Sequence, residues 1–89
     1  MSMSFAVETP PLRTDADGVV LVANTRVPLD TVIAAFAAGA TAEEIVQQFP
    51  SLALADVYQV IGYYLRRPTE IQAYLRRKRT RFAAVRASN

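Results

Sequence analysis

The first apolar segments of the chain are two short runs, Leu12–Thr14 and Val19–Ala23, separated by the polar sequence Asp15–Gly18. Extended runs on either side of an Asp-Gly pair are typical of a β-hairpin, because glycine supplies the positive φ that a tight turn needs. Asn24 tolerates a left-handed conformation, and Pro28 has no N–H for a sheet ladder. The pattern therefore predicts an N-terminal β-hairpin whose second strand ends between these two residues.

Downstream, the apolar positions change to helical spacing. A first helix is expected over Asp30–Ala38, with its first residue as the N-cap and Gly39 as the residue that ends it. A second helix should begin at Thr41, because Thr41 and Glu44 have the spacing of a capping box. Pro50 should end that helix, since the residue before a proline is pushed away from helical angles.

A third helix is expected from Leu54 to Arg66, and Pro68 suits the first turn of a fourth. The predicted inner stripe of the third helix consists of Leu54, Val57, Ile61, Tyr64 and Leu65. On the fourth helix, one face holds Ile71, Leu75, Phe82 and Val85, interrupted by Lys78. Two short helices joined by a tight turn after another helix have the plan of a helix-turn-helix.

The expected fold class is mainly α: a short N-terminal β-hairpin, a tri-helical helix-turn-helix and a basic C-terminal helix. We expect residues 1–10 to be a flexible N-terminal tail and residues 11–67 to form the β-hairpin and helix-turn-helix domain. Residues 68–89 should form the basic C-terminal helix and tail. A domain this small buries only about 60–65% of its unfolded surface, so we expect a homodimer that gains further buried area.

Charge is sorted along the chain. Residues 1–65 carry two basic and seven acidic side chains, a net charge of −5, whereas residues 66–89 carry eight basic side chains and one acidic one, a net charge of +7. The eight basic residues are Arg66, Arg67, Arg76, Arg77, Lys78, Arg79, Arg81 and Arg86. A cationic segment of this density favours an anionic partner, on nucleic acid or on another protein.

Composition narrows the chemistry that the chain can perform. Because it has no cysteine and no histidine, catalysis would have to use carboxylates, hydroxyl groups or its single lysine, Lys78, which we expect to be solvated. The acidic residues match no catalytic motif, and the three glycines form no phosphate loop. We therefore expect no enzyme, no catalytic residue, no cofactor, no metal and no small-molecule substrate. With no signal peptide and no membrane-spanning pattern, the expected location is cytoplasmic.

Six segments carry a family resemblance: Asn24–Val32, Gly39–Val46, Phe49–Leu52, Leu54–Tyr58, Ile61–Leu65 and Tyr74–Leu75. Over about residues 12–79 the chain resembles the small prokaryotic family named domain of unknown function 433. The resemblance implies a homeodomain-like helix-turn-helix fold and the role of a VapB-like predicted antitoxin, whose toxin is a PIN-like nuclease. It carries over no catalytic residue. Asn24 departs from the family's usual glycine, and Ala53 departs from its usual serine or threonine helix cap.

Few side chains of the third helix suit the reading of DNA. A reading helix presents bidentate side chains to base edges and basic residues to phosphates, and here only Gln59 resembles an adenine reader. Arg66 and Arg67 follow at the helix end, where cations also interact favourably with the helix dipole. These three residues are candidates for nucleic-acid binding, and solvent-facing or structural roles are the alternative.

Arg26 is the fourth nucleic-acid-binding candidate. It lies in the loop that follows the hairpin, beside an acidic body. We prefer the interpretation that it pairs with a nearby carboxylate, Glu44 or Asp30, and so holds the hairpin to the helices.

The middle of the third helix holds the candidates for a dimer interface. Gly62 costs about 1 kcal/mol relative to alanine in a helix, which indicates a close helix approach at this position. Tyr58 and Tyr63 are the other two candidates. Tyr58, like Tyr64, is expected to be a core or interface aromatic and not a stacking platform for bases, and Tyr63 is expected to face solvent or a dimer partner.

Three interpretations of the basic tail stay open. It could neutralise about five to seven phosphates, bind a toxin through an apolar face with arginines in an acidic pocket, or be a solvated helix end. We favour toxin binding, with DNA contact shared or secondary. The partner-binding candidates are Tyr74, Leu75, Arg76, Arg77, Arg79 and Phe82.

The sequence thus favours an antitoxin of a type II toxin–antitoxin pair. It would bind and neutralise a PIN-like nuclease encoded nearby, with a further role in autoregulating its operon through DNA binding. The alternative is a stand-alone DNA-binding transcription regulator. A third interpretation is an orphan structural or assembly module.

Overall fold

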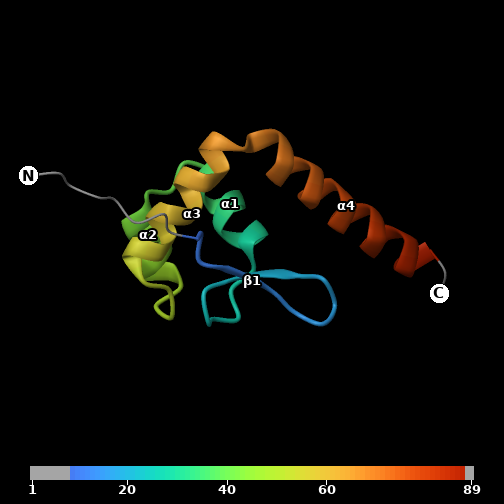
Figure 1. Ribbon diagram of the computed structural model, residues 1–89, viewed down its shortest axis with the longest axis horizontal. Coiled ribbons are helices and arrows are strands. Elements are labelled where there is room, and N and C mark those ends of the chain that lie inside the picture. The colour runs from blue at the N-terminus through green and yellow to red at the C-terminus, as the bar shows by residue number, and fades with distance from the viewer. Residues whose placement is uncertain (1–8, 88–89) are drawn as a thin grey trace, which may run out of the picture.

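The computed structural model describes the backbone of residues 9–87 and the side chains of residues 9–78. Its elements are β1 (Leu12–Thr14), β2 (Val20–Val22), α1 (Leu29–Ala37), α2 (Ala42–Gln48), α3 (Leu54–Arg66) and α4 (Pro68–Ala87) (Figure 1). The described part is therefore mainly helical with an N-terminal hairpin, as predicted. The prediction of a flexible tail at residues 1–10 falls almost entirely outside the described residues.

The hairpin forms as the sequence predicts. β1 and β2 pair antiparallel, with Leu12 opposite Val22 and Thr14 opposite Val20. In the turn, Gly18 has a φ of 82° and its N–H donates to the carbonyl of Asp15. The Asp15 carboxylate closes the turn, because it accepts hydrogen bonds from the backbone of residues 17 and 19.

The loop after β2 differs from the prediction at one residue. Ala23, not Asn24, takes the positive φ, at 50°. The hairpin fixes this conformation: the Ala23 N–H donates to the Pro11 carbonyl at 2.7 Å, and the Ala23 carbonyl accepts a hydrogen bond from Nε of Arg13 at 2.9 Å. A left-handed alanine costs about 1–2 kcal/mol, which these two hydrogen bonds offset. Arg13, which the sequence analysis did not single out, also bonds the Thr25 carbonyl.

Helix α1 begins and ends close to the predicted residues, but its N-cap is not Asp30. Pro28 occupies the N-cap position and makes no side-chain capping bond. Asp30 lies within the first turn, where a carboxylate interacts favourably with the helix dipole. The C-terminus is a Schellman motif, as Gly39 suggested: its φ is 103°, its N–H donates to Phe36, and the Ala40 N–H donates to Ala35.

The second and third helices follow their local signals. Thr41 and Glu44 form the complete predicted capping box of α2. Helix α3 has the predicted bounds and, as expected from Ala53, no side-chain cap. Its inner face differs from the predicted stripe, because Val60 is buried and Leu54 and Leu65 are exposed.

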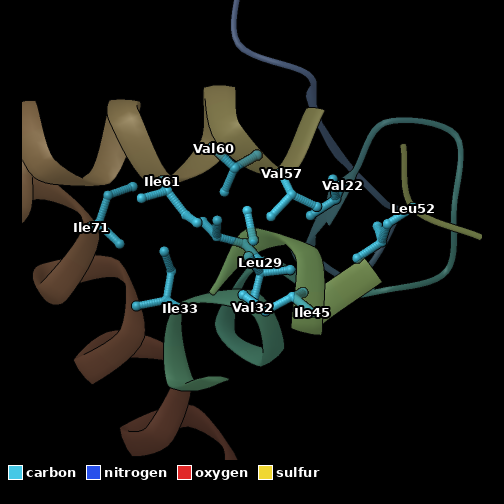
Figure 2. Close-up of a cluster of buried hydrophobic side chains, with 11 residues drawn as sticks. Val22, Leu29, Val32, Ile33, Ile45, Leu52, Val57, Val60, Ile61 and Ile71 are labelled. Carbon is cyan, nitrogen blue, oxygen red and sulfur yellow. The ribbon is translucent and has the colours of Figure 1, made fainter. Parts of the chain in front are cut away.

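The core lies between α1, α2, α3 and the hairpin (Figure 2). Side chains from all of these elements and from the start of α4 converge there. The labelled members are Val22, Leu29, Val32, Ile33, Ile45, Leu52, Val57, Val60, Ile61 and Ile71. At its edge, the rings of Phe36 and Tyr64 meet edge-to-face with their centroids 6.3 Å apart. This contact adds to the packing of α1 against α3.

The first turns of α4 are fixed to the body by three contacts. Ile71 is buried in the core, and the Tyr74 hydroxyl accepts a hydrogen bond from the Val20 N–H at 2.9 Å. Nζ of Lys78 lies 2.9 Å from Oδ2 of Asp30 in α1. The expectation of a solvated Lys78 is wrong, because position 78 lies on the same helical face as Ile71 and Tyr74. Beyond these contacts α4 extends away from the body (Figure 1).

The ion pair yields a first prediction. Lys78→Ala should lower the free energy of unfolding by about 1–2 kcal/mol, because Asp30 keeps a partly shielded carboxylate and loses its cation. Urea unfolding of Asp30→Ala, Lys78→Ala and the double variant should give a coupling energy of about 1 kcal/mol. Arg77→Ala on the exposed face is the matched control and should change stability by less than about 0.5 kcal/mol. A coupling energy of zero would contradict the structural role of the pair.

The capping box yields a second prediction, on pH. The Thr41 backbone and hydroxyl hydrogen bonds lower the pKa of Glu44 in the folded chain. A depressed carboxyl pKa contributes stability above the unfolded value of about 4.3, and this stability is lost as pH falls through the folded pKa. Glu44→Gln, which keeps an acceptor but does not titrate, should therefore show a flatter loss of urea midpoint on acidification than the wild type. Equal slopes would contradict the assignment.

Candidate functional site

Exposed arginines form two pairs on the last third of the described chain. Arg66 and Arg67 are exposed where α3 ends, and Arg76 and Arg77 are exposed on α4. The second pair follows the first by ten residues, which corresponds to about 15 Å of helical backbone at 1.5 Å per residue. We call these four residues the arginine band. The band can form charge-assisted hydrogen bonds with carboxylates or phosphates.

Arg67 also has structural contacts within the band. Its guanidinium carbon lies 5.4 Å from the centroid of the Tyr63 ring, and its Nη1 lies 3.8 Å from Oε2 of Glu70. The side chains of this ion pair are 60% and 63% exposed, so the pair contributes little to stability. Arg67 thus stacks at the junction of α3 and α4, whereas Arg66 is the more accessible of the two for a partner.

The predicted pairing of Arg26 is wrong. Arg26 is exposed in the loop between β2 and α1, and it forms no ion pair with Asp30 or Glu44. Lys78 binds Oδ2 of Asp30, and the Glu44 carboxylate is used by the capping box. The hairpin is instead held to the helical body by the burial of Val22 in the core and by the hydrogen bond from the Val20 N–H to the Tyr74 hydroxyl of α4.

The four nucleic-acid-binding candidates do not gather in one patch. The loop that carries Arg26 lies below the body in Figure 1, whereas the junction that carries Arg66 and Arg67 lies above it. Gln59 is half-buried on α3. A single DNA surface that uses all four side chains is therefore not present in this arrangement.

Tyr74 and Leu75 lie against the domain and not on a free apolar face. Both are half-buried and pack on the core, and the Tyr74 hydroxyl is hydrogen-bonded to the hairpin. Both were predicted to bind a partner, and in the structure they contact the chain's own core, since α4 folds its inner face onto its own body. Arg76 and Arg77 do project outward. Arg79 and Phe82 fall within the helical backbone of α4, and their side chains lie outside the described residues.

The outer side of α3 holds an apolar surface that the sequence analysis did not foresee. Among described side chains, the exposed large hydrophobic ones are Leu54, Tyr58 and Leu65, at 41%, 53% and 59% exposure. Leu54 and Leu65 were assigned to the inner stripe because they lie at its edge; Leu65 is about 80° around the helix from buried Val57. The position of each residue around the helix axis, at about 100° per residue, distinguishes the exposed face from the buried one.

Gly62 and Tyr63, the other dimer-interface candidates, lie in different surroundings. A Cβ built on Gly62 would meet no atom within 4 Å, so no neighbouring segment of the chain approaches closely there. The expected close helix approach is therefore absent within the described chain. Tyr63 packs partly on the core and stacks with Arg67, away from the exposed face that holds Tyr58.

An acidic group borders the exposed face of α3. The Tyr58 hydroxyl donates a hydrogen bond to Oε1 of Glu43 at the start of α2. This bond lowers the pKa of Glu43 and raises the pKa of Tyr58, so Glu43 is ionised and Tyr58 is neutral at neutral pH. This apolar surface therefore has a negative charge beside Tyr58 and the exposed Arg66 directly after Leu65.

These surfaces are suited to binding. In the described part of the chain, no group of three or more histidine, cysteine, aspartate or glutamate residues is placed to hold a metal ion. None of the helices over residues 9–87 is long and apolar enough to cross a membrane.

Comparison with known proteins gives one match. Curated proteins and solved structures each provide no match to the chain. A family model matches residues 16–64, from the hairpin turn to the last turns of α3, so α4 lies beyond the match. Because this match covers more than half of the sequence, the chain belongs to the family described as protein of unknown function (DUF433).

Proposed function

We propose that this protein is a cytoplasmic, non-enzymatic antitoxin that binds and neutralises a PIN-like nuclease through the outer face of α4. The observation that carries the proposal is the exposure of Arg76 and Arg77 on a helix whose opposite face is fixed to the body. A partner that binds them meets a helix whose backbone is already oriented, so little backbone ordering opposes binding.

The mechanism is charge pairing with an acidic metal site. A PIN-like nuclease is expected to bind its metal ions with a cluster of carboxylates, and arginine forms bidentate hydrogen bonds with carboxylates. Arginines from α4 that enter such a pocket would compete with the metal for the same oxygens. Nuclease activity would then be lost without any change in the antitoxin's own covalent structure.

The helical body supports a second role in DNA binding. α1, α2 and α3 have the order of a homeodomain-like helix-turn-helix, in which α3 would be the reading helix. Its outer face is poor in base-reading groups, and this favours a secondary, phosphate-dominated contact from Arg66 and the rest of the band. Autoregulation of the operon would use this contact. A stand-alone transcription regulator remains the competing function.

The proposal predicts the effect of charge reversal on partner binding. Arg76→Glu with Arg77→Glu should weaken the complex with the protein from the adjacent reading frame about 100-fold, because buried charge pairs at interfaces contribute strongly. Calorimetry of the purified pair would measure the change. The matched control is Arg26→Glu, a charge reversal at another exposed arginine. Arg13 is not used as a second control site, because its guanidinium is hydrogen-bonded to the Ala23 carbonyl. Equal loss from Arg26→Glu, or no loss from the double reversal, would contradict the proposal.

A truncation separates the antitoxin from the regulator. A chain ending at Lys78 keeps Ile71, Tyr74 and the ion pair to Asp30, whereas one ending at Arg67 would lose all three anchors of α4. The antitoxin function predicts that the chain ending at Lys78, which keeps Arg76 and Arg77, retains affinity for the nuclease, whereas the chain ending at Arg67 loses it. Because both chains lack Arg79, Arg81 and Arg86, their DNA binding should have a shallower salt dependence. Gel shifts over a salt series and nuclease assays would measure both. Full operator binding by the full-length chain, with no affinity of that chain for the neighbouring protein, would favour the regulator.

A further inference from the structure

Helix α3 carries a stripe of residues that lies outside the hydrophobic core of the described chain. Leu54, Tyr58, Gly62 and Leu65 follow one another at spacings of four, four and three residues, so they share one face of the helix. The core is filled by a neighbouring face of the same helix, from Val57, Val60 and Ile61 (Figure 2). We call these four residues, of which Leu54, Tyr58 and Leu65 are exposed and Gly62 is half-buried, the α3 stripe.

The glycine in the stripe indicates what kind of group covers it. Gly62 weakens the helix relative to alanine, and a Cβ at this position would meet no atom of the described residues within 4 Å. The conformation of the residue does not require glycine either, because its φ is not positive. A glycine would be required if the backbone of another helix crossed α3 closely at this position. The side chains that flank the glycine would then pack on either side of the point where the helices cross.

We propose that the α3 stripe binds the α3 stripe of a second copy of this chain, with the two helices antiparallel and crossing at Gly62. A two-fold interface must be self-complementary. In this arrangement Tyr58 of each copy faces Leu65 of the other copy. Apolar groups thus meet apolar groups on both sides of the crossing.

Charge complementarity selects the antiparallel orientation. Glu43, held by Tyr58, lies beside the N-terminal half of the stripe, and Arg66 follows Leu65 at its C-terminal end. Antiparallel helices bring Glu43 close to the partner's Arg66 at both ends, whereas parallel helices would place like charges together. The opposed helix dipoles favour the same orientation.

The size of the stripe determines the strength expected of the dimer. Three half-exposed side chains and a glycine form a surface smaller than the roughly 800 Å² per partner of a standard interface. We therefore expect a monomer–dimer equilibrium that depends on protein concentration.

Substitutions at Gly62 test the crossing without disturbing the monomer. Gly62→Lys should weaken dimerisation at least about 10-fold in sedimentation equilibrium of the full chain, because a long side chain separates the two helices. Gly62→Ala is the matched control: it should raise the melting temperature of the monomer by about 4 °C and reduce dimerisation much less. Gly62→Lys should melt no lower than the wild type, which shows that it folds.

A cysteine at the same position tests the geometry. The chain has no cysteine, so Gly62→Cys introduces a single thiol that mild oxidation should link across the two-fold axis. Gln72→Cys, exposed on α4, is the control and should cross-link far less. Glu43→Lys and Arg66→Glu should each weaken the dimer, and the double variant should restore it if the orientation is antiparallel.

Several results would overturn this proposal. A wild-type chain that stays monomeric at every concentration would do so, as would equal dimerisation of Gly62→Lys and the wild type. If the chain is monomeric and Gly62→Lys instead abolishes binding of the neighbouring protein or of DNA, that molecule occupies the stripe. The proposal goes beyond the proposed function and does not rest on it, since the chain is measured alone.

Discussion

The orientation of the cationic helix depends on the contacts that fix the first turns of α4 to the body. Ile71, Tyr74 and Lys78 lie on one face of that helix and contact the core, the hairpin and α1 in turn. Because a helix turns about 100° per residue, Arg76 and Arg77 must then face away from the body. The exposure of these arginines is therefore a consequence of burial on the opposite face.

The same contacts explain how positive charge is divided between structure and surface. The single lysine of the chain has a side chain only 17% exposed and pairs with Asp30, one of the acidic residues of the body. The exposed positions of the band are all arginine, which stays charged at any physiological pH and forms bidentate hydrogen bonds. A lysine stem can cover apolar surface while its ammonium reaches a carboxylate, so this residue suits the inner face.

Local rules in the sequence predicted the elements of the fold well. The Asp-Gly turn, the capping box of Thr41 and Glu44, and the glycine that ends α1 each depend on residues within a few positions of one another. Contacts between distant residues were not predictable in this way. Lys78 and Asp30 are 48 residues apart, and a capping role for Asp30 looked equally reasonable without the tertiary contact.

Prediction of the candidate site had the same limit. Charge sorting identified Arg76 and Arg77 correctly as exposed cations, because an excess of arginine cannot be buried. It also assigned Tyr74 and Leu75 to a free face, since the sequence does not show that α4 folds back on the hairpin. Leu54 and Leu65 show the converse error: an apolar residue at the edge of a helical stripe can lie on either side of it.

The two proposed surfaces are compatible because they use different helices. Self-association would cover the α3 stripe, while the outer face of α4 stays open to an acidic partner. A dimer would then carry two cationic helices, and a partner that is itself dimeric could bind both. Its second contact would form at the high effective concentration set by the first, so modest affinity at each helix could give strong neutralisation. Weak dimerisation through α3 would thus link the concentration of this protein to its inhibitory strength.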